Sequence, residues 1–297
     1  MTDVAVVEGV RVGLTRGEAN RAMRGFISAS GVWCMWGQTV GIGTAVFVGY
    51  ALHLGADASY IALFTSVAYF LAVCQLVVPL LGRRLQRRKR YIVSVGCVEI
   101  LFRSSPALIP FLFAEHLRLD ALMILVGLGL LCGYSLSPFY NTWVVNSVPE
   151  NIRARFTSRQ TIVSTLVAMF SGFAVGRFID SFSPDEKQVG FNLVFGVGAL
   201  FGWLGYIVLS RTPFAAGADM RRGDDAVGGL TRLLEPFRDG NFVRAVVFFG
   251  MWTFALGIAG PLYGVFMIEH LGISYTEISL FNAAFMITSI AGYRLWA

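Results

Sequence analysis

Eight long apolar runs dominate this chain of 297 residues, and each run is long enough to cross a lipid bilayer as a helix. Charged residues make up 14% of the chain, against roughly a quarter in soluble domains, and they concentrate between the runs. The runs lie near residues 26–52, 59–81, 91–114, 121–145, 159–179, 190–209, 242–268 and 276–297. The pattern predicts an all-α membrane protein with about eight transmembrane helices.

Arginine and lysine are unevenly distributed between the two sides of such a protein. They crowd the N-terminal segment and the connections after the second, fourth and sixth runs, whereas the opposite loops hold only Arg118 and Lys187. Because cytoplasmic loops carry the excess of basic residues, we expect a multi-pass protein of the inner cell membrane with a cytoplasmic N-terminus. The net charge of +6 then suits the anionic leaflet of the lipid bilayer. The basic residues form no continuous face, so nucleic acid is not an expected partner.

One segment of the chain occurs twice. The sequence HLGADASYIALF at residues 53–64 returns as HLGISYTEISLF at 270–281, with six identities in twelve. Six runs separate the two copies, so both would enter the membrane the same way up. This predicts a parallel repeat of two six-helix units, the second of which stops early, since residue 297 aligns with Leu80.

The repeat defines the expected domain organisation. Residues 1–25 form a cytoplasmic N-terminal segment, and residues 26–210 form the first six-helix unit. Residues 211–241, rich in Gly, Pro and mixed charge, read as a cytoplasmic linker. Residues 242–297 would be the first two helices of a second unit that is truncated at its C-terminus.

Two basic motifs mark the cytoplasmic connections. The turn VPENIRARF at 148–156 carries Pro149, Glu150, Arg153 and Arg155. The segment LGRRLQRRKR at 81–90 follows the second run and contributes Arg83, Arg84, Arg87, Arg88, Lys89 and Arg90.

The two-unit organisation and these motifs resemble the major facilitator superfamily, with the turn at 148–156 similar to the family's turn between spans four and five. The second motif occupies the place of the family's basic loop but lacks its Asp and its second Gly, so the family's gating contact through that Asp is not expected here. The resemblance implies a major-facilitator-like helical bundle of twelve helices, of which about eight are present, and transport by alternating access.

Few ionisable residues lie deep within the runs. Glu99 and Arg103 are one helical turn apart, so they can form an ion pair on one face. Because an unpaired charge at mid-bilayer costs at least about 2.5–3.5 kcal/mol, both side chains should face protein or water. Two interpretations stay open: a proton or substrate site, or a self-neutralised pair that fixes helix packing.

The resemblance implies that spans one, four, seven and ten line the substrate cavity. In the first run we select Gln38 as the deepest uncharged polar group. In the fourth run Tyr134, Ser137 and Asn141 share one stripe, which either lines a cavity or bonds across helices. In the seventh run Gly260, Pro261 and Gly264 mark a bend, either a gate or a static kink.

Enzyme chemistry has no recognisable signature in the chain. There is no metal-spaced set of His and Cys, no phosphate-binding Gly loop and no nucleophile elbow, so we expect no enzyme, no metal and no cofactor. The sequence predicts a secondary transporter of a small-molecule substrate, either a solute or an amphiphile, with coupling to a proton or another ion left open. The alternatives are a truncated inactive fragment, a partner subunit and, less favoured, a polytopic membrane enzyme.

Overall fold

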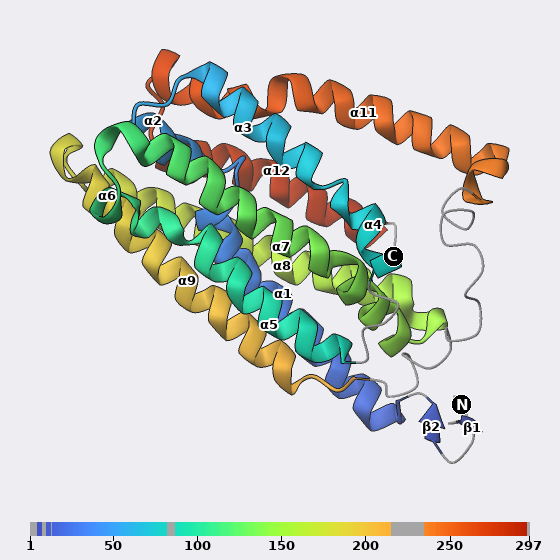
Figure 1. Ribbon diagram of the computed structural model, residues 1–297. Coiled ribbons are helices and arrows are strands. Elements are labelled where there is room, and N and C mark those ends of the chain that lie inside the picture. Colours follow the sequence, from blue (N-terminus) through green and yellow to red (C-terminus); the bar gives the residue numbers. More distant parts are fainter. Residues whose placement is uncertain (1–4, 8–9, 13, 82–86, 215–234, 296–297) are drawn as a thin grey trace.

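The computed structural model describes residues 5–7, 10–12, 14–81, 87–214 and 235–295. A short antiparallel hairpin precedes the helices, and it pairs β1 (Ala5–Val7) with β2 (Val10–Val12). The rest of the described chain is a bundle of helices (Figure 1). The first five longer helices are α1 (Arg16–Val40), α2 (Ala45–His53), α3 (Ala58–Leu71), α4 (Cys74–Leu81) and α5 (Arg88–Arg103). They are followed by α6 (Ile109–Leu112), α7 (Arg118–Ser147), α8 (Glu150–Asp180), α9 (Lys187–Arg211), α11 (Gly240–Val265) and α12 (Tyr275–Leu295).

Six helical segments of the described chain are long and apolar enough to cross a membrane. This is typical of a membrane protein. They cover residues 16–53, 58–78, 115–147, 150–180, 184–211 and 240–270. The predicted number of eight is not confirmed. The run at 91–114 is divided, because Pro106 lies in a 3-10 turn (Ser105–Ala107) that separates α5 from α6. Helix α12 has 21 residues but is not among the six.

The first run is also divided. Helix α1 begins ten residues before the predicted start, at a capping box formed by Thr15 and Glu18. It ends at Val40, and Thr44 caps the start of α2 by accepting a hydrogen bond from the Phe47 N–H. Residues 41–44 thus connect two helices within one membrane-length segment.

The two copies of the repeated sequence adopt equivalent turns. The helical segments before them end at His53 and His270, and the next helices begin at Ala58 and Tyr275, at the same offset. Gly55 and Gly272 both have positive φ, +92° and +62°, a conformation that glycine adopts without steric cost. Both turns lie at the same end of the bundle (Figure 1).

The opposite end of the bundle carries the basic connections. Helices α1, α5, α8 and α11 begin there, and α7 and α9 end there (Figure 1). The described basic residues at these helix ends include Arg16, Arg21, Arg87, Arg90, Arg155, Arg211, Arg238 and Arg244. The asymmetry of charge along the sequence is therefore an asymmetry between the two ends of the bundle.

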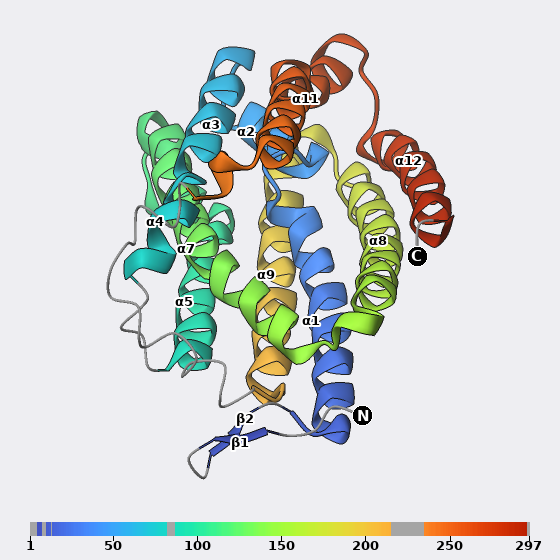
Figure 2. The same ribbon diagram turned by 90° about the vertical axis from the view of Figure 1, so that its right-hand side faces the viewer.

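Helix α12 packs along α8, on the flank of the bundle (Figure 2). Close approach is possible because Gly176 has no side chain: a Cβ there would lie 2.6 Å from the Tyr275 carbonyl oxygen. The carboxylate of Asp180, at the end of α8, accepts hydrogen bonds from the Tyr275 N–H (3.2 Å) and the Thr276 N–H (2.7 Å). A side chain of one helix thus caps the N-terminus of the other.

We expect Asp180→Ala to loosen α12 from α8, because two N–H groups of the α12 first turn lose their acceptor. Loss of a cap costs about 1–2 kcal/mol, so the midpoint of thermal unfolding in detergent should fall. Asp185→Ala is the matched control, since Asp185 is an exposed carboxylate in the 3-10 turn Pro184–Glu186 before α9 and makes no hydrogen bond to α12 within the described residues. Equal midpoints for both variants would contradict the capping role.

Candidate functional site

Helices α1, α5, α7 and α9 surround a polar cavity of about 280 Å³. The four helices lie side by side in the bundle (Figures 1 and 2). The lining residues are Trp33, Ile92, Glu99, Arg103, Leu130, Gly133, Tyr134, Leu136, Ser137, Tyr140 and Tyr206. Four residues selected from the sequence, Glu99, Arg103, Tyr134 and Ser137, therefore meet at one site.

The predicted ion pair between Glu99 and Arg103 is confirmed. Glu99 is 6% exposed, and its Oε1 accepts a hydrogen bond from Arg103 Nη1 at 3.1 Å. The Tyr206 hydroxyl, from α9, donates to the other oxygen at 2.9 Å. Both carboxylate oxygens are thus hydrogen-bonded, which a buried carboxylate requires.

Arg103 connects this pair to the break in the first run. Its Nη2 donates to the Val40 carbonyl at 3.3 Å, at the C-terminus of α1. The guanidinium carbon lies 4.8 Å from the ring centroid of Trp36, a cation–π arrangement. Trp36 in turn donates to the Ser104 hydroxyl at 3.1 Å. The end of α1 is therefore held by charged and polar groups of α5 and of the residue that follows it.

Small residues let the polar side chains reach each other. A Cβ on Gly133 of α7 would lie 2.5 Å from the Glu99 Oε1. A Cβ on Gly96 of α5 would overlap the Tyr206 ring, and a Cβ on Gly205 of α9 would overlap the Trp33 indole. Tyr206 is not recognisable from the sequence because 107 residues separate it from Glu99, and the role of these glycines depends on which helix packs against each of them.

The remaining cavity candidates lie apart from this site. Asn141 continues the stripe of α7, and its amide is 3.5 Å from the Ser137 hydroxyl, but it is exposed and does not line the cavity. Gln38 is half-buried on another face of α1, where its Oε1 lies 3.0 Å from the position that a Cβ on Gly172 of α8 would occupy. The structure thus separates Gln38 from Tyr134 and Ser137.

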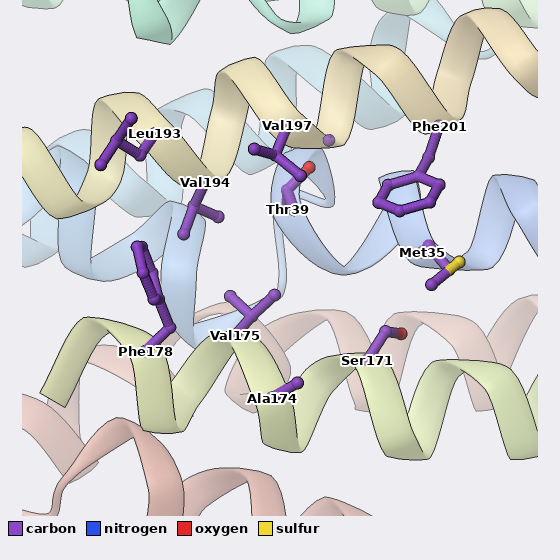
Figure 3. A pocket seen from close by; sticks show the side chains of 11 residues that line it. Met35, Thr39, Ser171, Ala174, Val175, Phe178, Leu193, Val194, Val197 and Phe201 are labelled. Carbon is purple, nitrogen blue, oxygen red and sulfur yellow. The ribbon is translucent and has the colours of Figure 1, made fainter. Parts of the chain in front are cut away.

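A second cavity, of about 250 Å³, lies between α1, α8 and α9 (Figure 3). Its walls are apolar except for Thr39 and Ser171. Both hydroxyls donate to carbonyl oxygens of their own helices, Thr39 to Trp36 at 2.7 Å and Ser171 to Val167 at 2.6 Å. Few polar groups are left there to orient a ligand, so the polar cavity is the better candidate site.

The basic segment after the second run contacts the ends of neighbouring helices. Arg83 and Arg84 lie outside the described residues. Arg88 lies over the Phe139 ring at 6.0 Å, whereas Arg87 and Arg90 are exposed. Lys89 donates to the Thr212 carbonyl at 2.8 Å, just after α9, and lies 5.8 Å from the Trp143 ring centroid. Burial lowers the pKa of the Lys89 ammonium from its ordinary value.

A basic residue in the first turn of α8, Arg153, caps the C-terminus of α7. Pro149 precedes α8, and Glu150 is its first residue. Arg153 Nη2 donates to the carbonyls of Val145 and Val148 at 3.2 and 3.4 Å, at the end of α7, while Arg155 is exposed. The guanidinium thus satisfies carbonyls that the helix leaves free.

Helix α11 remains helical through Gly260 and Pro261 and ends at Val265, followed by a π-helical turn, Phe266–His270. A Cβ on Gly264 would lie 3.3 Å from Val48 of α2, so this glycine is a contact position. The bend at these residues stays a prediction.

Comparison with protein-family models, with curated proteins and with solved structures finds no match to this chain. Within the described residues no three His, Cys, Asp or Glu side chains come together in a way that could hold a metal ion. The interpretation of the polar cavity therefore depends on its own side chains.

We expect Gly133→Ala to displace the Glu99 carboxylate and to destabilise the bundle, because the new methyl group would occupy the space of Oε1. The loss should be about 1–3 kcal/mol, seen as a lower unfolding midpoint in detergent. Gly127→Ala, on the same helix, is the control: its Cβ would meet Leu71 at an ordinary 3.7 Å. That variant should be neutral or slightly stabilising, since alanine favours a helix by about 1 kcal/mol over glycine. If Gly133→Ala were equally harmless, the packing account of the site would be wrong.

Proposed function

We propose that this protein is a secondary transporter of the major facilitator kind, which moves a small solute or amphiphile by alternating access of two units. The observation that carries the proposal is the repeated turn. Its two copies share the helix boundaries and the positive φ of Gly55 and Gly272, and they lie at the same end of the bundle. Parallel repeats related by an axis along the membrane normal are a hallmark of such carriers.

The orientation follows from the charge asymmetry. The basic ends of α1, α5 and α8 would face the cytoplasm, with the repeated turns on the outer side of the inner membrane. In this arrangement α8 belongs to the first unit and α12 to the second. Their contact, with Asp180 capping α12, would be part of the surface across which the units move.

The polar cavity is the proposed position of the substrate within the first unit. The Glu99 carboxylate is held at 3.1 Å by the Arg103 guanidinium and at 2.9 Å by the Tyr206 hydroxyl. We therefore assign the pair to orientation and packing, and leave coupling to a proton or another ion to other groups. A partner subunit, or a chain that is inactive alone, stays the alternative, and a polytopic membrane enzyme is less favoured.

The proposed topology predicts that the two repeated turns are labelled from the same side of the membrane. The four native cysteines would first be replaced by serine. A single cysteine would then replace either Ser59 or Leu271, which are both exposed beside the turns. In intact cells a membrane-impermeant maleimide should label both, while a cysteine at the exposed Ser210, at the basic end, should react only after permeabilisation. Labelling of Ser59→Cys and Leu271→Cys from opposite sides would remove the basis of the carrier proposal.

Alternating access predicts that a reversible link between α8 and α12 stops solute exchange. The pair Asp180→Cys and Thr276→Cys would be joined by a short reducible bis-thiol reagent in proteoliposomes loaded with isotope-labelled metabolites. We expect protein-dependent efflux of at least one metabolite to fall by about tenfold or more, and to recover with reductant, because the units must separate there. The control links Ser30→Cys to Gln160→Cys, which hydrogen-bond within the first unit, and should leave efflux unchanged.

If neither linked protein differs from the unlinked one, rocking of two units is excluded. If no metabolite leaves the vesicles under any condition, the inactive or partner-subunit alternative is favoured instead.

A further inference from the structure

We infer that the polar cavity binds a small, neutral, ring-shaped molecule through an oxygen that accepts hydrogen bonds, and that it discriminates against ions. The inference rests on the proposed function only in taking this molecule to be the transported solute. Three features of the cavity lead to it: its balanced charge, its unpaired N–H donors and its aromatic walls.

The charge of the cavity is already balanced. Glu99 and Arg103 are the acidic and basic residues among its lining, and they neutralise each other at 3.1 Å. An anionic ligand would have to lie near the Glu99 carboxylate, and a cationic one near the Arg103 guanidinium. Either would bring one uncompensated charge into an apolar bundle, which is costly. Charge balance therefore favours a neutral ligand.

Two buried N–H donors of the lining residues lack an acceptor within the described chain. Arg103 Nε and Trp33 Nε1 are buried and have no hydrogen-bond partner within the described chain. Both oxygens of Glu99 already accept a hydrogen bond, one from Arg103 and one from Tyr206. A buried N–H without an acceptor costs about 1–3 kcal/mol, so an acceptor arriving in the cavity would be stabilised. A carbonyl or ether oxygen supplies such an acceptor without adding charge.

The walls suit a flat ring. Trp33, Tyr134, Tyr140 and Tyr206 all line the cavity. The Trp33 ring lies 4.9 Å from that of Tyr206 and 5.6 Å from that of Tyr140, in tilted and edge-to-face arrangements. Aromatic side chains at these angles offer ring faces and edges to a further ring. A volume of about 280 Å³ holds a single-ring compound, whereas a large amphiphile would not fit.

Three probes of equal size separate the charge classes: benzamide is neutral with a carbonyl acceptor, benzoate is an anion and benzylammonium is a cation. Binding to the purified protein in detergent would be measured by calorimetry. We expect saturable binding of benzamide and at least about tenfold weaker binding of the two ions, since a difference of 1.4 kcal/mol is a factor of ten.

Two variants test the donors. Trp33→Phe keeps a ring but removes the Nε1–H, and should weaken benzamide binding roughly three- to tenfold. Trp203→Phe is the matched control, because Trp203 lies on α9 outside the cavity lining, and it should bind as the native protein does. Arg103→Lys keeps the positive charge beside Glu99 but has no Nε–H, so it tests the second donor even where Trp33→Phe does not fold.

Binding of benzoate or benzylammonium as tightly as benzamide would overturn the inference. So would unchanged benzamide affinity in both donor variants, or absence of benzamide binding, which would mean that the cavity holds only water. The proposed transport can fail independently: selective benzamide binding together with unaltered efflux after linking α8 to α12 would keep the site and remove the carrier mechanism.

Discussion

The buried carboxylate of Glu99 is the interaction on which the organisation of the first helices depends. A charge in this environment must be compensated, and three helices contribute to its surroundings: Arg103 from α5, Tyr206 from α9 and the close approach of Gly133 on α7. Arg103 then reaches the last carbonyl of α1 at Val40. One charge thus fixes the relative positions of four helices, and the polar cavity is the space left beside it.

Basic residues also bind backbone carbonyls at other helix ends. Arg153 binds the last carbonyls of α7, and Lys89 binds the Thr212 carbonyl after α9. Trp143 adds a hydrogen bond to the Pro213 carbonyl at 3.0 Å. The basic segments therefore have a structural role at helix C-termini besides their effect on orientation in the membrane.

Local patterns were predictable from the sequence, and contacts between distant helices were not. The pair of Glu99 and Arg103 follows from helical periodicity, and the equivalent turns at Gly55 and Gly272 follow from the repeated residues. Tyr206 was missed because 107 residues separate it from Glu99. The side chain of Gln38 lies against Gly172 of α8, and only the packing of α1 on α8 shows this. The prediction of one helix over 91–114 is wrong, because hydropathy does not register the break at Pro106.

The repeated turns have a consequence for how such a chain enters the membrane. In the first turn Asp57 caps α3 by accepting from the Tyr60 N–H, and the Ala56 N–H donates to the Ala51 carbonyl. In the second turn Ser274 and Glu277 exchange hydrogen bonds across three residues. These hydrogen bonds at the helix ends all join residues that are at most five positions apart in the chain. Each turn can therefore take shape while the ribosome is still adding later helices, whereas the helices beside the second turn pack on distant partners, α11 on α2 and α3 and α12 on α8.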